Sequence, residues 1–133
     1  MKEITKFSTQ YLSYQIVATV FFKEGGFIID ISGPADHLGG IGIGIPYMRK
    51  NGKKSANFHC ISFPSHRDGE LAGNIARIVA KITRLYTVVI VGIHLPKITK
   101  IQLNALIHTL EEWTTEWSYQ LINEIFSSSE KVK

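Results

Sequence analysis

The chain has 133 residues, of which 15 are Lys or Arg and 11 are Asp or Glu, so its formal net charge is +4. This length indicates one domain, and a hydrophobic content of 44% excludes a disordered chain. The single cysteine excludes an internal disulfide and cysteine-rich metal sites. No apolar run reaches the roughly 18 residues of a membrane helix, and residues 1–14 lack the features of a secretory signal. We therefore expect a cytoplasmic protein whose partners are neither membranes nor nucleic acids.

The first half of the chain has the short apolar pattern of β-strands. β-Branched and aromatic residues predict strands at 14–22, 27–32, 40–45 and 57–63, and the short turns between them imply an antiparallel meander. In the third strand three isoleucines alternate with glycines and share one face, which we expect to pack under the helices; they are Ile41, Ile43 and Ile45. The bare glycine face suits the close approach of a helix, a second chain or a ligand.

A basic turn connects the last two of these strands. Residues 49–54 hold four cations and no acid, and Asn51-Gly52 at their centre is a strong hairpin signal. The resulting hairpin tip either protects the sheet edge and aids solubility, or contacts a phosphate or a partner. In the strand that follows, His59 and Cys60 point to opposite faces and form no nucleophile pair. We expect Cys60 to be a buried thiol.

The second half of the chain has a helical period. An apolar stripe over 71–85 predicts one helix, and the apolar run 87–91 predicts a strand buried on both faces. Thr99 and Gln102 form a capping-box pattern at the start of a helix that ends at Phe126. At about 42 Å this helix is longer than the domain needs. Its far end must therefore cover a sheet edge, meet a partner or kink.

Together these elements predict a single α+β domain over residues 1–126, followed by a frayed tail over 127–133. The predicted architecture is an antiparallel β-meander with an added strand and two C-terminal helices packed on one face. The bare glycine face and the overlong last helix, with Trp113 and Trp117, exceed the apolar surface that one small domain covers. We therefore expect a homodimer.

Three histidines stand at junctions between the predicted elements. His37 precedes the third strand, His66 follows the fourth, and His94 follows the fifth. Junctions at one end of a sheet can meet in space, so these histidines could line one rim. Gly39 and Gly40 would let a ligand approach the backbone beside them.

The segment after the fourth strand opens a helix, whose first N–H groups and positive dipole end favour an anion. His66 and Arg67 add positive charge there, so the segment predicts a phosphate site. Alternatively, Asp68 or Ser65 only caps the helix. Asp68 or Glu70 could also orient a histidine imidazole for binding or proton transfer.

A metal site is the competing interpretation of the same rim. His37, His66 and His94 would supply nitrogen ligands, and an acidic residue of the helix start would supply oxygen. No ligand pair has helical spacing, and we expect no metal. His59 in a strand and His108 in a helix are expected to be structural or exposed.

Three segments carry a family resemblance, namely His37-Leu38-Gly39-Gly40 entering a strand, Ser65-His66-Arg67-Asp68 with Glu70-Leu71-Ala72 opening a helix, and Gly92-Ile93-His94 ending a strand. In their order and spacing, from Phe27 to Ile125, the chain resembles the prenylated flavin chaperone LpdD-like family. The chain departs from the family pattern at Ser65, where a glycine is expected, and at Pro96-Lys97, where Asp-Asn is expected.

The resemblance implies an accessory protein rather than an enzyme. Such proteins assist the maturation of UbiD-type decarboxylases, which use prenylated FMN, and their fold type is similar to that of proteasome-assembly chaperones. The resemblance also implies a site for prenylated FMN or FMN, formed by His37, Gly39, Gly40, His66, Arg67, Asp68, Glu70 and His94. The alternative is a protein-interaction assembly chaperone with no small-molecule ligand. A metal-dependent hydrolase is a third possibility, which no local catalytic motif supports.

Overall fold

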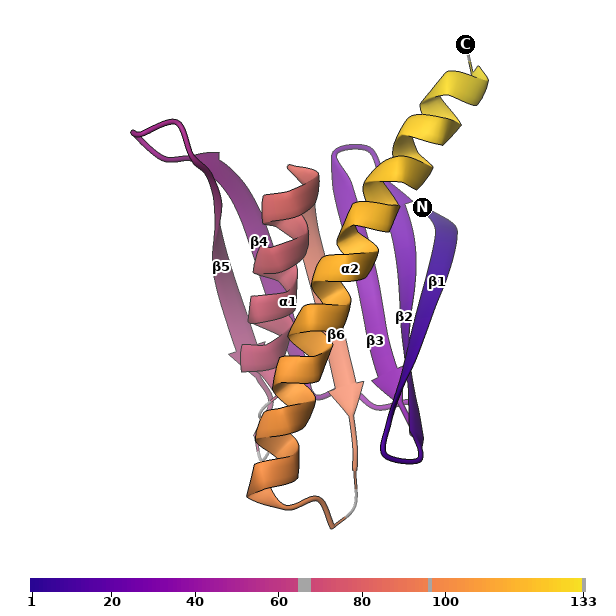
Figure 1. The fold of residues 1–133 in the computed structure, drawn as a ribbon, viewed down its shortest axis with the longest axis vertical. Helices are drawn as coiled ribbons and strands as arrows, with labels where there is room; N and C mark the ends of the chain where they lie inside the picture. The colour runs from indigo at the N-terminus through magenta and orange to yellow at the C-terminus, as the bar shows by residue number, and fades with distance from the viewer. Residues whose placement is uncertain (65–67, 96, 133) are drawn as a thin grey trace.

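The computed structural model describes residues 1–64, 68–95 and 97–132, with their side chains up to residue 125. These residues form one six-stranded sheet and two helices (Figure 1). The strands are β1 (Lys2–Tyr11), β2 (Tyr14–Lys23), β3 (Gly26–Gly33), β4 (Gly40–Met48), β5 (Lys54–Ser62) and β6 (Tyr86–Ile93). The helices are α1 (Asp68–Thr83) and α2 (Lys100–Val132). The predicted α+β class is confirmed.

The strand order is β1-β2-β3-β6-β4-β5, which places β6 in the middle of the sheet. β3 and β6 are parallel, and the other neighbouring strands are antiparallel. The predicted sheet of mostly antiparallel strands with one added strand is confirmed, but the added strand β6 lies between β3 and β4, so these two strands do not pair as consecutive strands of a meander would. Val89 and Val91 of β6 are fully buried, as suits a central strand. The edge strand β1 is absent from the predicted elements.

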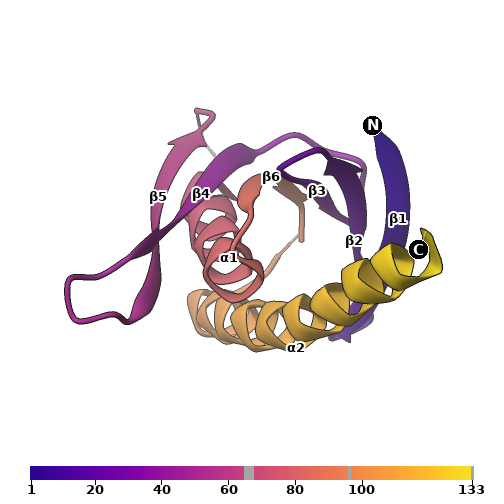
Figure 2. The same ribbon diagram turned by 90° about the horizontal axis from the view of Figure 1, so that it is seen from above.

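Both helices cover the same face of the sheet (Figure 2). Fully buried strand residues such as Ile29 and Val91 belong to a core that α1 and α2 complete. On the other face Val88 and Ile90 are only half-buried, because no helix of the described chain lies over them. The prediction that this strand is buried on both faces is therefore wrong.

α1 packs on the glycines of β4 and not on its isoleucines. A Cβ on Gly42 would overlap the backbone of Ala72, and a Cβ on Gly44 would overlap the backbone of Ala76. Successive strand residues point to opposite faces, so Ile41, Ile43 and Ile45 lie on the face without helices. The prediction that the isoleucine face packs under the helices is wrong, because only the glycine face admits a helix backbone this closely.

α2 begins with the predicted capping box. The N–H of Thr99 donates to Gln102 Oε1 (3.0 Å), and the N–H of Gln102 donates to Thr99 Oγ1 (3.1 Å). Farther along, Trp117 stacks on Phe7 of β1, with 5.2 Å between ring centroids. The far part of α2 therefore covers a sheet edge, which was one of the three predicted outcomes. The helix continues to Val132, and the fraying of 127–133 stays a prediction.

These contacts cover, within one chain, the two surfaces on which the predicted homodimer rested. The glycine face of β4 lies against α1, and Trp117 is buried between α2 and β1. A homodimer therefore needs another surface.

Within the described residues, neither α1 nor α2 has a stretch apolar enough and long enough to cross a membrane.

The basic turn between β4 and β5 projects away from the rest of the molecule (Figures 1 and 2). The N–H of Arg49 donates to the carbonyl of Lys53 (2.8 Å), and the N–H of Gly52 donates to the carbonyl of Arg49 (2.9 Å). Gly52 has a positive φ of 82°, and Asn51 does not. The hairpin tip is thus confirmed, but with a three-residue loop in place of a two-residue Asn-Gly turn.

Candidate functional site

Two of the three predicted histidines come together at the end of the sheet where β3 and β6 finish. Parallel strands end at the same edge, so the segment after β3 and the segment after β6 leave side by side. The rings of His37 and His94 lie 6.0 Å apart between centroids and are tilted by 52°. His37 is half-buried and His94 is exposed. The N–H of His94 donates to the carbonyl of Gly33 (3.2 Å). This hydrogen bond holds the segment that follows β6 against the end of β3.

Backbone contacts hold the His37 segment across the end of β6. A Cβ on Gly92 would overlap the carbonyl of His37, so the chain crosses β6 at a point where only glycine fits. The N–H of Gly39 donates to the carbonyl of Val91 (2.9 Å), and the carbonyl of Gly39 accepts from the N–H of Phe63 (3.1 Å). His37 is therefore positioned by the ends of β6 and β5 together.

The N-terminus of α1 occupies the space beside Gly39 and Gly40. A Cβ on Gly39 would overlap the Asp68 carboxylate, and a Cβ on Gly40 would overlap the backbone of Gly69. The close approach predicted at these two glycines is therefore made by a helix of the same chain, and both glycines are buried. Their place in a ligand site stays a prediction.

The acidic residues predicted for the site lie in the first turn of α1. Asp68 is half-buried against Gly39, whereas Glu70 is exposed. Negative charge at this end of a helix is favourable because the helix dipole is positive there. His66 and Arg67, the predicted anion ligands, lie outside the described residues. The predicted phosphate site at the start of α1 therefore stays a prediction.

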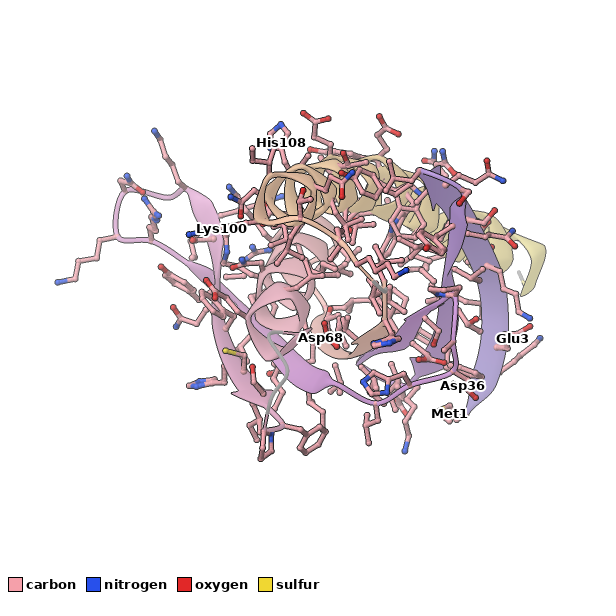
Figure 3. The ribbon with its side chains drawn as sticks, turned by 90° about the horizontal axis from the view of Figure 1, so that it is seen from below. Met1, Glu3, Asp36, Asp68, Lys100 and His108 are labelled. Carbon is pink, nitrogen blue, oxygen red and sulfur yellow. The ribbon has the colours of Figure 1, made fainter. Side chains whose placement is uncertain are left out.

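An open depression of about 510 Å³ adjoins the rim on the side of β2 and β3. Its lining is Gln15, Val17, Asp30, Ser32 and the segment 33–36, which leads directly into His37. The Ser32 hydroxyl donates to Asp30 Oδ1 (3.2 Å). Figure 3 views the molecule from this end and labels Asp36 and Asp68. The depression offers hydrogen-bond acceptors but no cation, so it suits N–H and O–H groups better than a phosphate.

Sequence reasoning missed this depression. Its signal in the sequence is the pair Asp30 and Ser32, which alternate with buried isoleucines in an otherwise apolar strand. Polar residues at that period lie on the face away from the core. The pattern reveals exposed polar positions, but only the fold shows that the segment 33–36 folds beside them.

The matched region of the chain identifies its family. The model of the prenylated flavin chaperone LpdD-like domain matches residues 10–122. The chain belongs to the LpdD-like family. The match includes His37, His94 and the whole of α1, so all three motif segments lie within the family domain. No curated protein matches the sequence.

The fold of this LpdD-like chain is also similar to a solved chaperone structure. A chain in the crystal structure of a novel chaperone complex for yeast 20S proteasome assembly has a TM-score of 0.56 and 16% sequence identity. The similarity covers 89% of the LpdD-like chain and 97% of that chain. At this identity the similarity shows a shared fold. The predicted relation in fold type to proteasome-assembly chaperones is confirmed.

The remaining candidate residues lie away from the rim. His59 is exposed in β5, and His108 is exposed on α2, where its Nε2 lies 2.9 Å from Glu112. Cys60 is exposed, so the expected buried thiol is wrong. Gly73 of α1 packs closely on Cys60, but β5 is an edge strand with no further described strand beside it, so the thiol stays open to solvent on that side. Within the described residues, no three His, Cys, Asp or Glu side chains gather as a metal site would require.

Proposed function

We propose that this LpdD-like chain binds prenylated FMN and assists its handover to a UbiD-type decarboxylase. The observation that carries the proposal is the His37–His94 pair, which lies at one rim inside the matched family domain. The cofactor carries the decarboxylation chemistry in the client enzyme. The residues of this chain therefore need only bind the cofactor, orient it and release it, and we propose no reaction for the chain itself.

The chemistry of the rim fits a flavin phosphate at the histidines. An imidazole donates a hydrogen bond in either protonation state, and a protonated one adds charge against a phosphate dianion. The depression beside the rim does not fit the phosphate, because Asp30 and Asp36 would repel it. Its acceptors suit the hydrogen-bond donors of the rest of the cofactor. Positive charge from His66 and Arg67 is part of the proposal, although both lie outside the described residues.

Flavin titration tests the role of the rim. The purified protein is titrated with FMN and with prenylated FMN, and binding is followed by flavin fluorescence. A charge-assisted bond to phosphate contributes about 1.5–3 kcal/mol, so His37→Ala and His94→Ala should each weaken binding about tenfold to a hundredfold. His59→Ala and His108→Ala are the matched controls, since both histidines are exposed elsewhere. Equal affinity of all four variants would rule out the histidine rim.

A transfer assay tests the client. The protein loaded with prenylated FMN is mixed with the apo form of a UbiD-type decarboxylase, and decarboxylation is compared with that after adding the free cofactor. We expect faster or more complete activation with the loaded protein, and a smaller gain with His37→Ala. Activation no better than with free cofactor would contradict the handover.

A second candidate function is an assembly chaperone that binds a protein client without a small ligand. The similarity in fold to a chain of a proteasome-assembly complex favours it. In that case neither FMN nor prenylated FMN binds, while the apo-decarboxylase still forms a complex with the purified chain.

For either function, we also propose that the protein is cytoplasmic and forms a homodimer.

A further inference from the structure

The two edges of the sheet, β1 and β5, are built differently. β1 has the features by which natural proteins keep an edge strand from pairing with a foreign strand. Its register with β2 shifts between Glu3 and Thr5, and Glu3 and Lys6 place charge on it. α2 also covers it, since Trp117 stacks on Phe7. β1 is therefore poorly suited to pair with a further strand.

β5 lacks this protection over Ser55–Phe63. The stretch contains no Lys, Arg, Asp, Glu or Pro, and the β4–β5 register runs without a shift from Lys54 to Ser62. All residues of Asn57–Ser62 are exposed. No strand or helix of the described chain lies beyond β5 (Figures 1 and 2). An open and regular edge of this kind is a template for an added strand.

The hydrogen bonds at the two ends of the β4–β5 pair show which backbone groups of β5 point outward. The N–H of Arg49 donates to the carbonyl of Lys53 (2.8 Å), and the N–H of Phe63 donates to the carbonyl of Gly39 (3.1 Å). Bonded and non-bonded pairs alternate along an antiparallel ladder, so the odd-numbered residues of β5 bond to β4. The N–H and C=O groups of the even-numbered residues therefore point to the open edge. The exposed members of this set are Phe58, Cys60 and Ser62.

The side chains along this edge differ between the two faces of the sheet. A Cβ on Gly73 of α1 would lie 2.8 Å from the Phe58 ring and 2.9 Å from the Cys60 Cβ, so both side chains lie on the helix side. Phe58 is 41% exposed there. Asn57 and His59 point to the other side. Directly opposite residues on one face are neighbours, so an added strand needs apolar side chains on the helix side and polar ones on the other.

The basic hairpin determines the charge at one end of the edge. Residues 49–54 hold four cations and no acid, and they lead directly into β5. Arg84 fixes the stem of the hairpin, since its guanidinium donates to the carbonyls of Tyr47 and Ser55, both at 2.9 Å. A strand added beside β5 meets this positive charge as it passes the hairpin, which favours acidic side chains at that end.

We propose that β5 binds an extended segment of a partner protein as an added antiparallel strand. The segment has apolar residues at alternate positions and acidic residues at its C-terminal end, which antiparallel pairing places beside the hairpin. Main-chain hydrogen bonds supply the affinity, and the apolar side and the hairpin select the sequence. β5 of a second copy ends at Ser62 without an acidic residue, so it fits the edge less well. This proposal does not depend on the proposed function.

Amide hydrogen exchange followed by NMR tests the added strand. The probe is a peptide of nine residues, the length of β5, in which valine and threonine alternate and the last three residues are glutamate. In the free protein the N–H groups of Asn57, His59 and Ile61 should be protected by β4, whereas those of Phe58 and Cys60 should exchange fast. Peptide at millimolar concentration should slow exchange at Phe58 and Cys60 several-fold.

Two outcomes of the exchange experiment would overturn the proposal. Unchanged exchange at Phe58 and Cys60 with the peptide present would show that no strand is added. Protection of both amides in the free protein would show that a second copy, or another part of this chain, already occupies the edge.

Fluorescence anisotropy of the labelled peptide compares variants of the edge. Cys60→Pro removes an outward N–H without removing a bond to β4, so it should weaken binding at least tenfold. Cys60→Ala is the matched control, because it keeps the N–H. Lys53→Glu combined with Lys54→Glu should weaken binding several-fold. Lys23→Glu, an exposed change at the end of β2, should leave binding unchanged.

Circular dichroism and thermal melting establish that each variant is folded. Equal binding by the folded Cys60→Pro and Cys60→Ala proteins would overturn the added strand, and should Cys60→Pro not fold, the exchange experiment decides. Equal losses in the hairpin variant and in Lys23→Glu would overturn the selection of acidic residues. A peptide with its glutamates at the N-terminal end should bind more weakly, and equal binding would overturn the antiparallel direction.

Discussion

At the scale of single residues, the glycines of β4 determine how closely α1 approaches the sheet. A Cβ on Gly42 would overlap the carbonyl group of Ala72, and one on Gly44 would overlap that of Ala76. Both obstacles are backbone atoms, so no change of side-chain rotamer relieves the overlap. The position of α1, and with it the position of Asp68 beside Gly39, depends on the absence of side chains in β4.

Gly42→Ala should therefore destabilise the protein by about 3 kcal/mol, because overpacking a contact between backbones forces the helix to shift. The measurement is the free energy of unfolding in urea. Ile43→Ala is the control, since it changes the next residue on the opposite face and should cost clearly less. A Gly42→Ala protein as stable as the wild type would show that α1 is not packed on the glycines.

Tyr47 near the basic hairpin provides a pH-dependent prediction. A hydrogen bond from the Ser55 hydroxyl, and then one from Arg49, lower the pKa of Tyr47 below its usual value of 10.0. Folding thus favours the ionised form, so the stabilisation is present above pH 10 and is lost as the pH falls through the lowered pKa.

Ultraviolet titration of tyrosinate should show one phenol that ionises before the others. Tyr47→Phe should remove this early phase, and Ser55→Ala should move it toward higher pH. Tyr119→Phe, which removes another exposed phenol, should leave the early phase intact. An early phase that persists in Tyr47→Phe would assign it to another residue.

At the scale of elements, features determined by neighbouring residues could be predicted from the sequence. The capping box of Thr99 and Gln102 and the turn at Gly52 depend on contacts within a few residues, and both occur where expected. The two faces of β4 could also be separated by their alternation. The face of β4 that packs against a helix could not be predicted from the sequence. That choice depends on how closely the α1 backbone approaches the glycines of β4, and hydrophobicity does not measure this steric fit.

Thr99→Ala should destabilise the protein by about 1 kcal/mol, because it removes the oxygen that accepts from the N–H of Gln102. Thr115→Ala in the middle of the same helix is the control. Its hydroxyl donates to the carbonyl of Glu111 within a turn already hydrogen-bonded, and alanine has the higher helix propensity. Thermal melting of both variants checks the difference, and equal loss in both would contradict a capping role.

At the scale of the whole molecule, α2 holds the edge strand β1 against the rest of the sheet. The Tyr11 hydroxyl donates to the carbonyl of Gln102 (2.7 Å), and Phe7 stacks on Trp117 farther along the helix. The sequence of β1 alternates as a strand does, with Phe7 and Tyr11 pointing inward and Lys6 pointing outward. An edge strand needs only one apolar face, so the polar residues on its outer face weaken the strand signal in the sequence.

Trp117→Phe should release β1 selectively. The smaller ring loses part of its contact with Phe7 at a cost of about 2 kcal/mol, whereas the buried indole N–H, which has no hydrogen-bond partner among the described residues, is lost without penalty. Hydrogen exchange should accelerate in Lys2–Tyr11 and change little in β6. Trp113→Phe, a half-buried neighbour, should affect β1 less. Uniform acceleration along all strands would mean that α2 stabilises the sheet as a whole.

The candidate site could be predicted in part because it depends on where strands end. His37 lies between β3 and β4, and His94 follows β6, so both stand where strands begin or end at one edge of the sheet. Residues at such junctions can be recognised in the sequence. The insertion of β6 between β3 and β4 could not be predicted, since strand order depends on contacts far apart in sequence. The same lack of long-range information concealed the depression beside Asp30.

The central position of β6 also determines how the chain can fold during synthesis. β1 to β5 leave the ribosome before β6 exists, and Gly26 of β3 must wait for its partner Tyr86. Until then β3 and β4 each expose an unpaired edge that can join another strand, including one from a second nascent chain. Closing the sheet requires pairing over a long sequence separation, which is the slow kind of folding step. The apolar strand that completes the core is thus also the one whose late arrival sets the time during which aggregation can compete with folding.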